Sequence, residues 1–414
     1  MTDSIDSQQV CVVVGASHAG SQLAVQLRKE GWTGRIILIG AEPHLPYHRP
    51  PLSKAVLAGE KSVDEIALRP HSMYTASAVE LCLGERVEHL DVLKKTLLLS
   101  TGESIAYDKL ALCTGARVRK LGLGDQLDGV HYLRTADDVA NLKSELVAGR
   151  LAVIIGGGYI GLEAAAVLTQ LGLQVTVLEA SKRLLQRVTS VVMSEYFQQL
   201  HESHGVKIVT HAHVTRLAGE GRVCAVVCAD GTEFVADLVV VGVGVTPETR
   251  LAEAAGLEVI NGIKVDQYAR TSAVDVYAAG DCTWHPSALY GHHVRLESVQ
   301  NALDQSRVAA ANIAGKQIAY EALPWFWSDQ YAVKLQSAGL LHGYDDMLVR
   351  GDRSNNDDKG FSVFYFREGK MIAADCVNRA KDFIVCKRLI AERLDINRQA
   401  LLDENSAPDT FASV

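Results

Sequence analysis

The sequence predicts an α/β protein with two Rossmann-like dinucleotide-binding domains, followed by a C-terminal α+β domain. Two glycine fingerprints, each between a hydrophobic strand and a helix, predict the nucleotide-binding domains. Alternating apolar and polar residues after residue 324 predict antiparallel strands, and hence the third domain. The length of 414 residues agrees with this division, because one hydrophobic core seldom organises so long a chain.

The first fingerprint covers residues 10–20, VCVVVGASHAG. Its glycines lack a Cβ, so the turn can close and backbone NH groups can approach a pyrophosphate at the positive end of a helix. Ser17 replaces the middle glycine, which argues against identical pyrophosphate geometry at the two sites but not against the site itself. A strand at 35–39 leads to Glu42, a carboxylate placed to accept ribose hydroxyls.

The second fingerprint covers residues 151–161, LAVIIGGGYIG. A strand at 174–178 leads to Glu179, which favours NADH because a carboxylate accepts a 2′ hydroxyl and repels the 2′ phosphate of NADPH. Arg183 follows four residues later and slightly weakens that preference. All three glycines of this motif are present: Gly156, Gly158 and Gly161.

The order of these signals predicts that the second nucleotide-binding domain is inserted into the first. Strand and turn signals continue at 107–115, 206–210, 223–228, 238–244 and 276–281. The expected domains are 1–113 with 247–325, then 114–246, then 326–402, with a tail at 403–414.

The C-terminal region changes pattern. Residues 324–339 and 360–378 alternate apolar and polar side chains, as half-buried antiparallel strands do. Residues 380–394 have the pattern of a helix, whose buried stripe would include Phe383. The last residues, DENSAPDTFASV, are so polar that we expect a flexible tail.

Charge and hydropathy exclude some classes of partner. The formal net charge of −8 argues against nucleic acid, whose phosphates demand a basic surface. No apolar run approaches the ~18 to 20 residues that a membrane span needs, so we expect no membrane insertion. The start, MTDSIDSQQ, does not resemble a secretory or organellar signal, and we therefore expect a cytoplasmic protein.

The cysteine spacings limit the chemistry. Cys224 and Cys228 are spaced CxxxC, but no second ligand pair accompanies them, and we expect no metal site. The sequence contains neither CxxC nor CxxxxC. A redox-active disulfide is therefore unsupported.

Several motifs together resemble the FAD-dependent ferredoxin and rubredoxin reductases over nearly the whole chain. These are the first fingerprint, RPPLSK at 49–54, YLRT at 132–135, GGGYIGLE at 156–163, GDC at 280–282, ESVQNAL at 297–303 and PWFWSDQY at 324–331. The resemblance implies a glutathione-reductase-like fold, with FAD in the first domain and NADH in the second. It also implies an iron–sulfur protein as electron acceptor.

The resemblance assigns roles to particular residues. Lys54 would lie near the flavin N5, paired with Glu163, where a cation stabilises negative charge on the reduced flavin. Asp281 would contact the ribityl chain, the NH of Val299 the pyrimidine end, and Trp327 the flavin itself. The plain alternatives are a surface lysine, a turn-capping carboxylate and a core tryptophan.

The expected cofactor-binding residues form two sets. Those for FAD are Gly15, Ser17, His18, Ala19, Gly20, Glu42, Arg49, Lys54, Val87, Arg134, Asp281, Val299 and Trp327. Those for NADH are Gly156, Gly158, Tyr159, Ile160, Gly161 and Glu179.

The resemblance predicts an NADH:ferredoxin oxidoreductase. NADH would reduce FAD, and the flavin would pass electrons singly to a [2Fe–2S] ferredoxin that serves an oxygenase, expected to be a haem monooxygenase. The basic segment 378–393 is the expected docking site for the ferredoxin, although an ordinary solvated helix is the alternative. Its candidate contacts, with one from a neighbouring helix, are Arg307, Arg379, Lys387 and Arg388.

Three other functions stay open. A rubredoxin reductase, or the reductase component of a ring-hydroxylating dioxygenase, would have almost the same sequence features. A disulfide or peroxide reductase shares the fold but lacks support because the cysteine pair is missing. A non-enzymatic, NADH-sensing flavoprotein would reduce its FAD without useful electron transfer to a partner.

Overall fold

The computed structural model describes residues 7–353 and 360–413, which form two compact units. Unit 1 is formed within Met1–His48, Val63–Arg117 and Thr246–Pro324, and unit 2 within Arg49–Ser62, Val118–Val245 and Trp325–Val414. Two of the places where the chain passes from one unit to the other lie in short strands, β8 (Ala116–Val118) and β17 (Val245–Pro247), which pair with each other.

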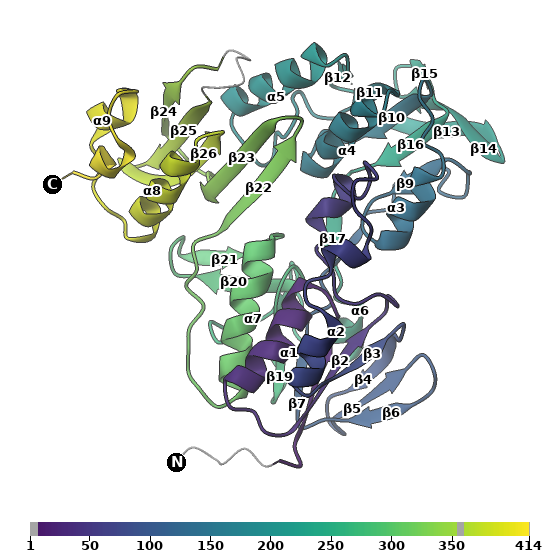
Figure 1. Cartoon of the computed structure of the whole chain (residues 1–414), viewed down its shortest axis with the longest axis vertical. Coiled ribbons are helices and arrows are strands. Elements are labelled where there is room, and N and C mark those ends of the chain that lie inside the picture. Colours follow the sequence, from purple (N-terminus) through teal and green to yellow (C-terminus); the bar gives the residue numbers. More distant parts are fainter. Residues whose placement is uncertain (1–6, 354–359, 414) are drawn as a thin grey trace. The chain divides into compact units, whose positions relative to one another are not determined.

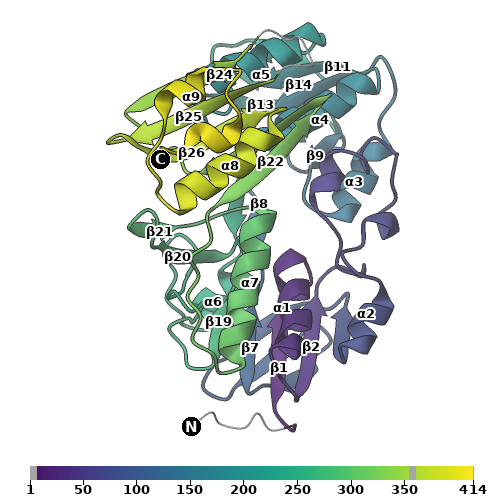
Figure 2. The same ribbon diagram turned by 60° about the vertical axis from the view of Figure 1, so that its left-hand side comes forward.

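Unit 1 is built on a five-stranded sheet in the order β19-β7-β1-β2-β3, whose strands are all parallel (Figure 1). Helices α1 (His18–Lys29) and α7 (Val299–Ile313) lie side by side against it (Figure 2). The central strand VCVVV is buried on both faces, as strands of parallel sheets usually are. The strands are β1 (Val10–Val14), β2 (Arg35–Gly40), β3 (Val79–Leu83), β7 (Lys109–Leu112) and β19 (Val276–Ala278).

Smaller elements complete unit 1. One antiparallel sheet comprises β4 (Val87–Asp91), β5 (Thr96–Leu99) and β6 (Ser104–Ala106). Another sheet comprises β18 (Ile263–Lys264), β20 (Thr283–Ser287) and β21 (His292–Val294). The short helices are α2 (His71–Ala76), α6 (Arg250–Ala254) and the 3₁₀ turn η2 (Asp64–Ile66).

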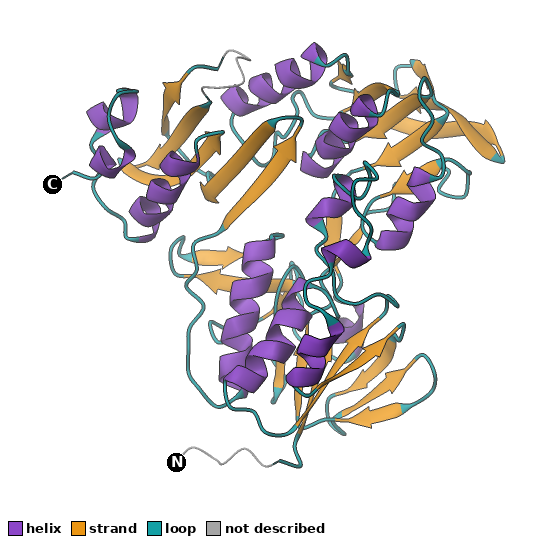
Figure 3. Ribbon diagram, viewed as in Figure 1, coloured by secondary structure: helices purple, strands orange, loops and turns teal. Residues whose placement is uncertain are grey.

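Unit 2 contains a second five-stranded parallel sheet, in the order β12-β11-β10-β16-β9. Its strands are labelled in Figure 1 and drawn in orange in Figure 3. Its strands are β9 (Val130–Tyr132), β10 (Leu151–Ile155), β11 (Gln174–Leu178), β12 (Lys207–Val209) and β16 (Leu238–Val241). Its helices are η1 (Pro50–Ser53), α3 (Ala136–Lys143), α4 (Tyr159–Gln170) and α5 (Val191–Ser203). An antiparallel sheet adds β13 (Val214–Glu220), β14 (Arg222–Cys228) and β15 (Glu233–Val235).

The C-terminal sheet of unit 2 is antiparallel throughout, in the order β22-β23-β26-β25-β24. Its strands are β22 (Trp325–Gln330), β23 (Val333–Gly339), β24 (Asp346–Gly351), β25 (Phe361–Arg367) and β26 (Lys370–Val377). The helices α8 (Ala380–Ala391), α9 (Arg398–Leu402) and η3 (Pro408–Phe411) follow. The predicted parallel nucleotide-binding sheets and the C-terminal α+β region are confirmed.

The strand β25 corrects one expectation, because its first six residues are all buried rather than half-buried. Helix α8 packs against the sheet at β23 and β26. Tyr196 of α5 lies with its ring 4.8 Å from that of Phe361, and the Tyr365 hydroxyl oxygen lies 2.9 Å from Ser190 Oγ. Because helices and loops cover the sheet in this way, the first six residues of β25 have no solvent-exposed face.

Residues 403–413, for which a flexible tail is expected, make specific contacts with the rest of unit 2, although most of them are exposed. The ring of Phe411 is fully buried, and Ala412 forms a β-bridge with Ile396. The buried guanidinium of Arg350 donates to the carbonyl oxygens of Glu404 at 3.1 Å and Ser406 at 2.7 Å. Arg350 therefore supplies hydrogen bonds to backbone carbonyl oxygens that water would bind in a disordered polar segment.

Within residues 7–353 and 360–413, no helix has the length and apolar character needed to cross a membrane.

Candidate functional site

The first glycine turn of unit 1 is too tight for any side chain at its two ends. A Cβ on Gly15, whose φ is +110°, would lie 2.1 Å from the carbonyl oxygen of Cys113. A Cβ on Gly20 would lie 1.9 Å from the carbonyl oxygen of Gly15. The turn therefore brings the start of α1 against the strand ends, with the first NH groups of the helix left without intrahelical partners.

The residues between these glycines open the helix. Ser17 is the N-cap residue, with extended backbone, and Ala19 lies in the first turn. The His18 side chain is buried, with its ring centroid 5.5 Å from that of His48. This end of α1 fits a dinucleotide phosphate, because the macrodipole and free NH groups favour negative charge there.

The end of β2 lies beside this turn, since the NH of Gly15 donates to the carbonyl oxygen of Ile39 at 2.8 Å. Glu42 follows β2, and its Oε2 accepts a hydrogen bond of 2.5 Å from the Tyr47 hydroxyl. Val87 is the half-buried first residue of β4 in the same unit. Glu42 is thus held near the turn that would carry the nucleotide.

Asp281 lies on a turn tied to helix α7. Gly280 precedes it with a φ of +90°, and a Cβ there would lie 3.1 Å from Cβ of Ala19. The side-chain oxygen of Gln305 accepts from the NH of Gly280 at 2.8 Å. The turn of Asp281 therefore meets both α1 and α7, the two helices that bear the other predicted FAD contacts of this unit.

Val299 is the first residue of α7. Ser298 caps the helix, accepting from the NH of Asn301 at 3.1 Å. The NH of Val299 is one of the groups that an α-helix leaves without an intrahelical partner. A polar, charge-accumulating atom of a ligand suits this position.

In unit 2, the 3₁₀ turn η1 places Lys54 against Glu163 of α4. Two prolines at the start of η1 fix its backbone. The Arg49 Nη1 atom donates to the carbonyl oxygen of Arg134 at 2.5 Å, joining this turn to the segment before α3. The ion pair that the resemblance implied is present, with Lys54 Nζ 2.6 Å from Glu163 Oε2.

The Glu163 carboxylate is buried, with 6 % of its surface exposed. Ser53 donates to its Oε2 at 2.6 Å and Ser328 to its Oε1 at 2.7 Å. A buried ion pair is held only when further hydrogen bonds satisfy its atoms. These two serines supply them, and sequence reasoning did not single them out although both lie in the motifs RPPLSK and PWFWSDQY.

The second glycine turn, in unit 2, repeats the first. A Cβ on Gly156, whose φ is +110°, would lie 2.5 Å from the carbonyl oxygen of Gly242. A Cβ on Gly161 would lie 2.3 Å from the carbonyl oxygen of Gly156. Gly158 is the N-cap of α4, and a Cβ on it would meet no atom within 4 Å, which leaves room for a phosphate.

The first residues of α4 differ in exposure. The Ile160 side chain is 42 % exposed, so it is accessible to a ligand. The Tyr159 hydroxyl is buried and has no hydrogen-bond partner among the described residues. Burial, with Asp375 and Glu163 nearby, raises the pKa of Tyr159 well above its usual value. Tyr159 therefore keeps its proton, and its ring packs 4.9 Å from Phe326.

Glu179 lies at the end of β11 beside the second turn. Its Oε2 accepts from the NH of Gly157 and its Oε1 from the NH of Ser181, both at 2.7 Å. The Arg183 side chain is engaged elsewhere, donating to Ser194 Oγ at 2.6 Å and to the carbonyl oxygen of Thr189 at 3.0 Å. Arg183 thus gives little support to a 2′ phosphate.

Trp327 is half-buried on β22, and its ring centroid lies 5.8 Å from that of Trp325. The Lys387 ammonium of α8 lies 4.8 Å from the centroid of Trp325. Arg388 is exposed on α8, whereas Arg379 precedes the helix and donates to the carbonyl oxygen of Gly360.

The predicted residues divide between the units. Lys54, Glu163, Arg49, Arg134, Trp327 and the second fingerprint belong to unit 2, as do Arg379, Lys387 and Arg388. The first fingerprint, Glu42, Val87, Asp281 and Val299 belong to unit 1. Arg307 also belongs to unit 1, where it forms an ion pair with Asp304 on α7.

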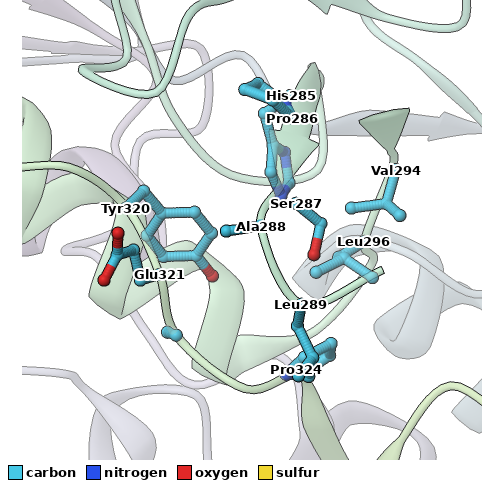
Figure 4. A pocket seen from close by; sticks show the side chains of 11 residues that line it. His285, Pro286, Ser287, Ala288, Leu289, Val294, Leu296, Tyr320, Glu321 and Pro324 are labelled. Atoms are coloured by element: carbon cyan, nitrogen blue, oxygen red, sulfur yellow. The ribbon is translucent and has the colours of Figure 1, made fainter. Parts of the chain in front are cut away.

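One pocket of unit 1 lies at the hairpin of β20 and β21, with Tyr320 facing Val294 and Leu296 across it (Figure 4). It holds about 10 Å³, roughly the space of one water molecule, and is therefore too small for a nucleotide. His285 lines it, and its buried Nε2 has no hydrogen-bond partner among the described residues. A water molecule suits that site.

Family models match the chain in two parts. A pyridine nucleotide-disulphide oxidoreductase model matches residues 9–306, and a reductase C-terminal model matches residues 325–409. These matches cover both glycine turns and the antiparallel C-terminal sheet.

Individual proteins match along nearly the full length. The chain is 45 % identical to a ferredoxin–NAD(P)(+) reductase of Sphingomonas sp., over 93 % of each protein. It is 41 % identical to putidaredoxin reductase of Pseudomonas putida, over 95 % of this chain and 94 % of that one. A crystal structure of the covalent putidaredoxin reductase–putidaredoxin complex matches with a TM-score of 0.93 and 40 % identity, over 96 % and 97 % of the two chains. The predicted resemblance to ferredoxin reductases is confirmed.

Proposed function

The chain belongs to the pyridine nucleotide-disulphide oxidoreductase family and is a ferredoxin reductase that uses FAD and NAD(P)H. From this premise we propose that it takes its electrons from NADH. We propose further that it passes them singly to a [2Fe–2S] ferredoxin serving a haem monooxygenase. A flavin converts between the two stoichiometries, because nicotinamide gives a pair of electrons and an iron–sulfur cluster takes one.

The observation that carries this proposal is the Lys54–Glu163 pair together with the two glycine turns. The turns provide backbone NH groups at two helix starts for two dinucleotides. Lys54 holds a positive charge at a fixed place, where it would stabilise negative charge developing on the flavin. Glu163 keeps that ammonium in position, and Asp281 and Val299 would hold the ribityl and pyrimidine ends.

NADH is the proposed donor because of Glu179. Its carboxylate is fixed beside the second turn by two backbone NH groups and would accept the ribose hydroxyls. A 2′ phosphate would meet this negative charge, and Arg183 is held away by its own hydrogen bonds.

The proposed docking surface for the ferredoxin is the exposed face of α8. The whole chain has a formal charge of −8, so an acidic ferredoxin would be repelled unless a local basic face dominates within a Debye length of ~8 to 10 Å. Lys387 and Arg388 provide such a face beside Trp325. The buried side of this helix is formed by Asp382, Phe383, Cys386, Leu389 and Ile390. Arg388 is exposed, whereas Lys387 is half-buried, with its ammonium over the rings of Trp325 and Phe383.

Other acceptors belong to the same chemistry. A rubredoxin, or the ferredoxin of a ring-hydroxylating dioxygenase, also takes one electron at a time. A disulfide acceptor is less suited, since all eight cysteines are free and spaced without a CxxC or CxxxxC pair. Free thiols also suit a reducing compartment, and we propose the cytoplasm.

The deciding experiment reduces the purified protein with NADH and offers it a panel of iron–sulfur proteins. The panel contains ferredoxins from haem monooxygenase systems, ferredoxins from dioxygenase systems, and rubredoxins. We expect fastest turnover with the first group and much slower flavin reduction by NADPH. If NADH reduces the FAD but no member of the panel is turned over, the non-enzymatic NADH-sensing role replaces the proposal.

A further inference from the structure

A line of hydrogen bonds runs from Glu163 into the C-terminal part of unit 2. Glu163 Oε1 lies 2.7 Å from Ser328 Oγ, which lies 3.1 Å from Gln330 Nε2. Gln330 Oε1 lies 2.8 Å from His201 Nε2, and His201 Nδ1 lies 3.2 Å from the Tyr331 hydroxyl. We call these five residues the Glu163 line.

The Glu163 line has one possible direction. A carboxylate only accepts, so the single hydroxyl proton of Ser328 must point at Glu163. Ser328 is then an acceptor for the amide NH₂ of Gln330, and the Gln330 oxygen faces His201. His201 must therefore carry its proton on Nε2, with Nδ1 accepting from Tyr331. Reversing the amide of Gln330 would leave Ser328 with two acceptors and one proton.

Three elements of unit 2 contribute to the line. Ser328 and Gln330 are two apart on β22, so their side chains share a face of the strand. His201 lies in the last turn of α5, and Glu163 lies on α4 next to β22. These four side chains are buried, so water does not readily replace a lost bond. Loss of the hydrogen bond at His201 is therefore expected to disturb the hydrogen bonds of Gln330 and Ser328, and through them the orientation of the Glu163 carboxylate.

The environment of His201 keeps its ring neutral. Burial, opposed by the Gln330 hydrogen bond and assisted by the charge of His204, lowers its pKa to about 4. The Tyr331 ring stacks on that of His204 at 3.7 Å. At neutral pH His201 therefore has the single ring proton that the direction of the line requires.

We propose that Ser328, Gln330 and His201 are positioning residues for flavin reduction. They orient the Glu163 carboxylate so that it holds the Lys54 ammonium in its working place. Ser53 and Lys54 both bind Oε2, whereas Ser328 is the partner of Oε1, so the line fixes the rotation of the carboxylate. The inference rests on the proposed place of Lys54 beside the flavin.

The first test is the pair His201→Leu and His201→Gln, with Ser328→Ala beside them. The glutamine amide can still donate towards Gln330, whereas leucine cannot. We expect Ser328→Ala and His201→Leu to lower the limiting rate of flavin reduction in stopped flow by about tenfold, as weakening one hydrogen bond to a charged group does. The Kd for NADH should stay the same and the flavin midpoint potential should become more negative, because the anionic reduced flavin loses stabilisation. His201→Gln should stay near the parental rate and potential.

A matched control separates positioning from general loss of packing. Ser337→Ala makes the same substitution in the same sheet, where the buried Ser337 donates to Asp375 at 2.5 Å. It should lower the melting temperature without changing the rate or potential. If Ser337→Ala slows the reaction as much as Ser328→Ala, the line is merely structural and the inference is overturned.

Lys54→Met distinguishes this inference from the proposed function. If Lys54→Met reduces at the parental rate, the place of Lys54 beside the flavin is wrong, and the inference falls with it. If Lys54→Met is slow while Ser328→Ala and His201→Leu are parental, the proposed function stands and the positioning role of the line is overturned.

Discussion

At the scale of single residues, Glu179 controls the choice between the two nicotinamide cofactors. We expect NADH to exceed NADPH in kcat/KM by roughly tenfold or more, because the fixed carboxylate repels a 2′ phosphate. Glu179→Ala should narrow that gap by improving NADPH, although Arg183 stays tied to Ser194 and Thr189. Steady-state kinetics with both cofactors check this, with the exposed Glu195→Ala as control. Equal efficiencies in the unmodified protein would rule out the NADH assignment.

Lys54 and Asp281 are expected to affect different steps. Lys54→Met removes the charge but no part of the glycine turns, so flavin reduction should slow while FAD stays bound. Asp281→Ala removes a proposed contact with the ribityl chain on a turn that packs against both α1 and α7. The protein should therefore lose FAD more readily on dilution. Stopped-flow absorbance measures the first effect and released flavin fluorescence the second. Parental reduction by Lys54→Met would contradict its place beside N5.

At the scale of elements, helix α8 tests the acceptor surface. Lys387→Glu with Arg388→Glu should lower ferredoxin turnover through slower association, with a strong dependence on salt. NADH-driven flavin reduction and activity with small-molecule acceptors should stay the same, because neither requires a docked protein.

The control for α8 is Lys94→Glu with Arg216→Glu, which changes the net charge equally at two exposed sites. If both double variants lower turnover to the same extent, only the global charge matters. Unchanged ferredoxin kinetics of the α8 variant at low salt would move the docking surface elsewhere.

The C-terminal segment is a second element with a measurable role. The Phe411 ring is buried beside Phe364, and the Arg350 guanidinium lies 5.0 Å from its centroid. Phe411→Ala should lower the free energy of unfolding by about 3 kcal/mol or more, as truncating a buried aromatic ring does. Denaturant titration checks this, and the exposed Asp409→Ala should be nearly neutral. Equal stabilities would mean that the segment contributes nothing to the fold.

At the scale of the whole molecule, the sequence predicted what local chemistry requires. The tight turn between strand and helix excludes a Cβ and requires a positive φ, which only glycine readily adopts. Gly15 and Gly156 could therefore be assigned from the sequence alone. The burial of Phe411 and the Glu163 line could not, because they depend on segments far apart in sequence. His201 and Gln330, for example, are separated by 129 residues, and no local pattern marks a histidine as the partner of a strand amide. The contacts of the polar C-terminal segment could not be predicted for the same reason, since its carbonyl oxygens accept from the distant Arg350.

Two buried histidines, His201 and His285, are expected to make the stability of the whole molecule sensitive to acid. Burial lowers the pKa of His201 and of His285 from 6.5 to about 4, with His204 and His293 adding to the effect. Between those two pKa values the unfolded chain binds protons that the folded chain does not. The contribution of these histidines to stability is therefore fully present above pH 6.5 and is lost as the pH falls towards 4. Each histidine contributes at most about 3 kcal/mol.

Asp375 acts in the opposite direction. Burial raises the pKa of this carboxyl despite hydrogen bonds from Ser337, Thr189 and Tyr365, so it favours the folded state at low pH and offsets part of the histidine effect. The measurement is the melting temperature of the parent and of His201→Gln between pH 7 and pH 4. The parent should lose stability more steeply than His201→Gln, because glutamine takes up no proton in the unfolded chain. If the melting temperatures of the two proteins fall in parallel over this range, His201 is not neutral in the folded protein. Its Nδ1 would then carry a proton and donate to Tyr331 instead of accepting from it.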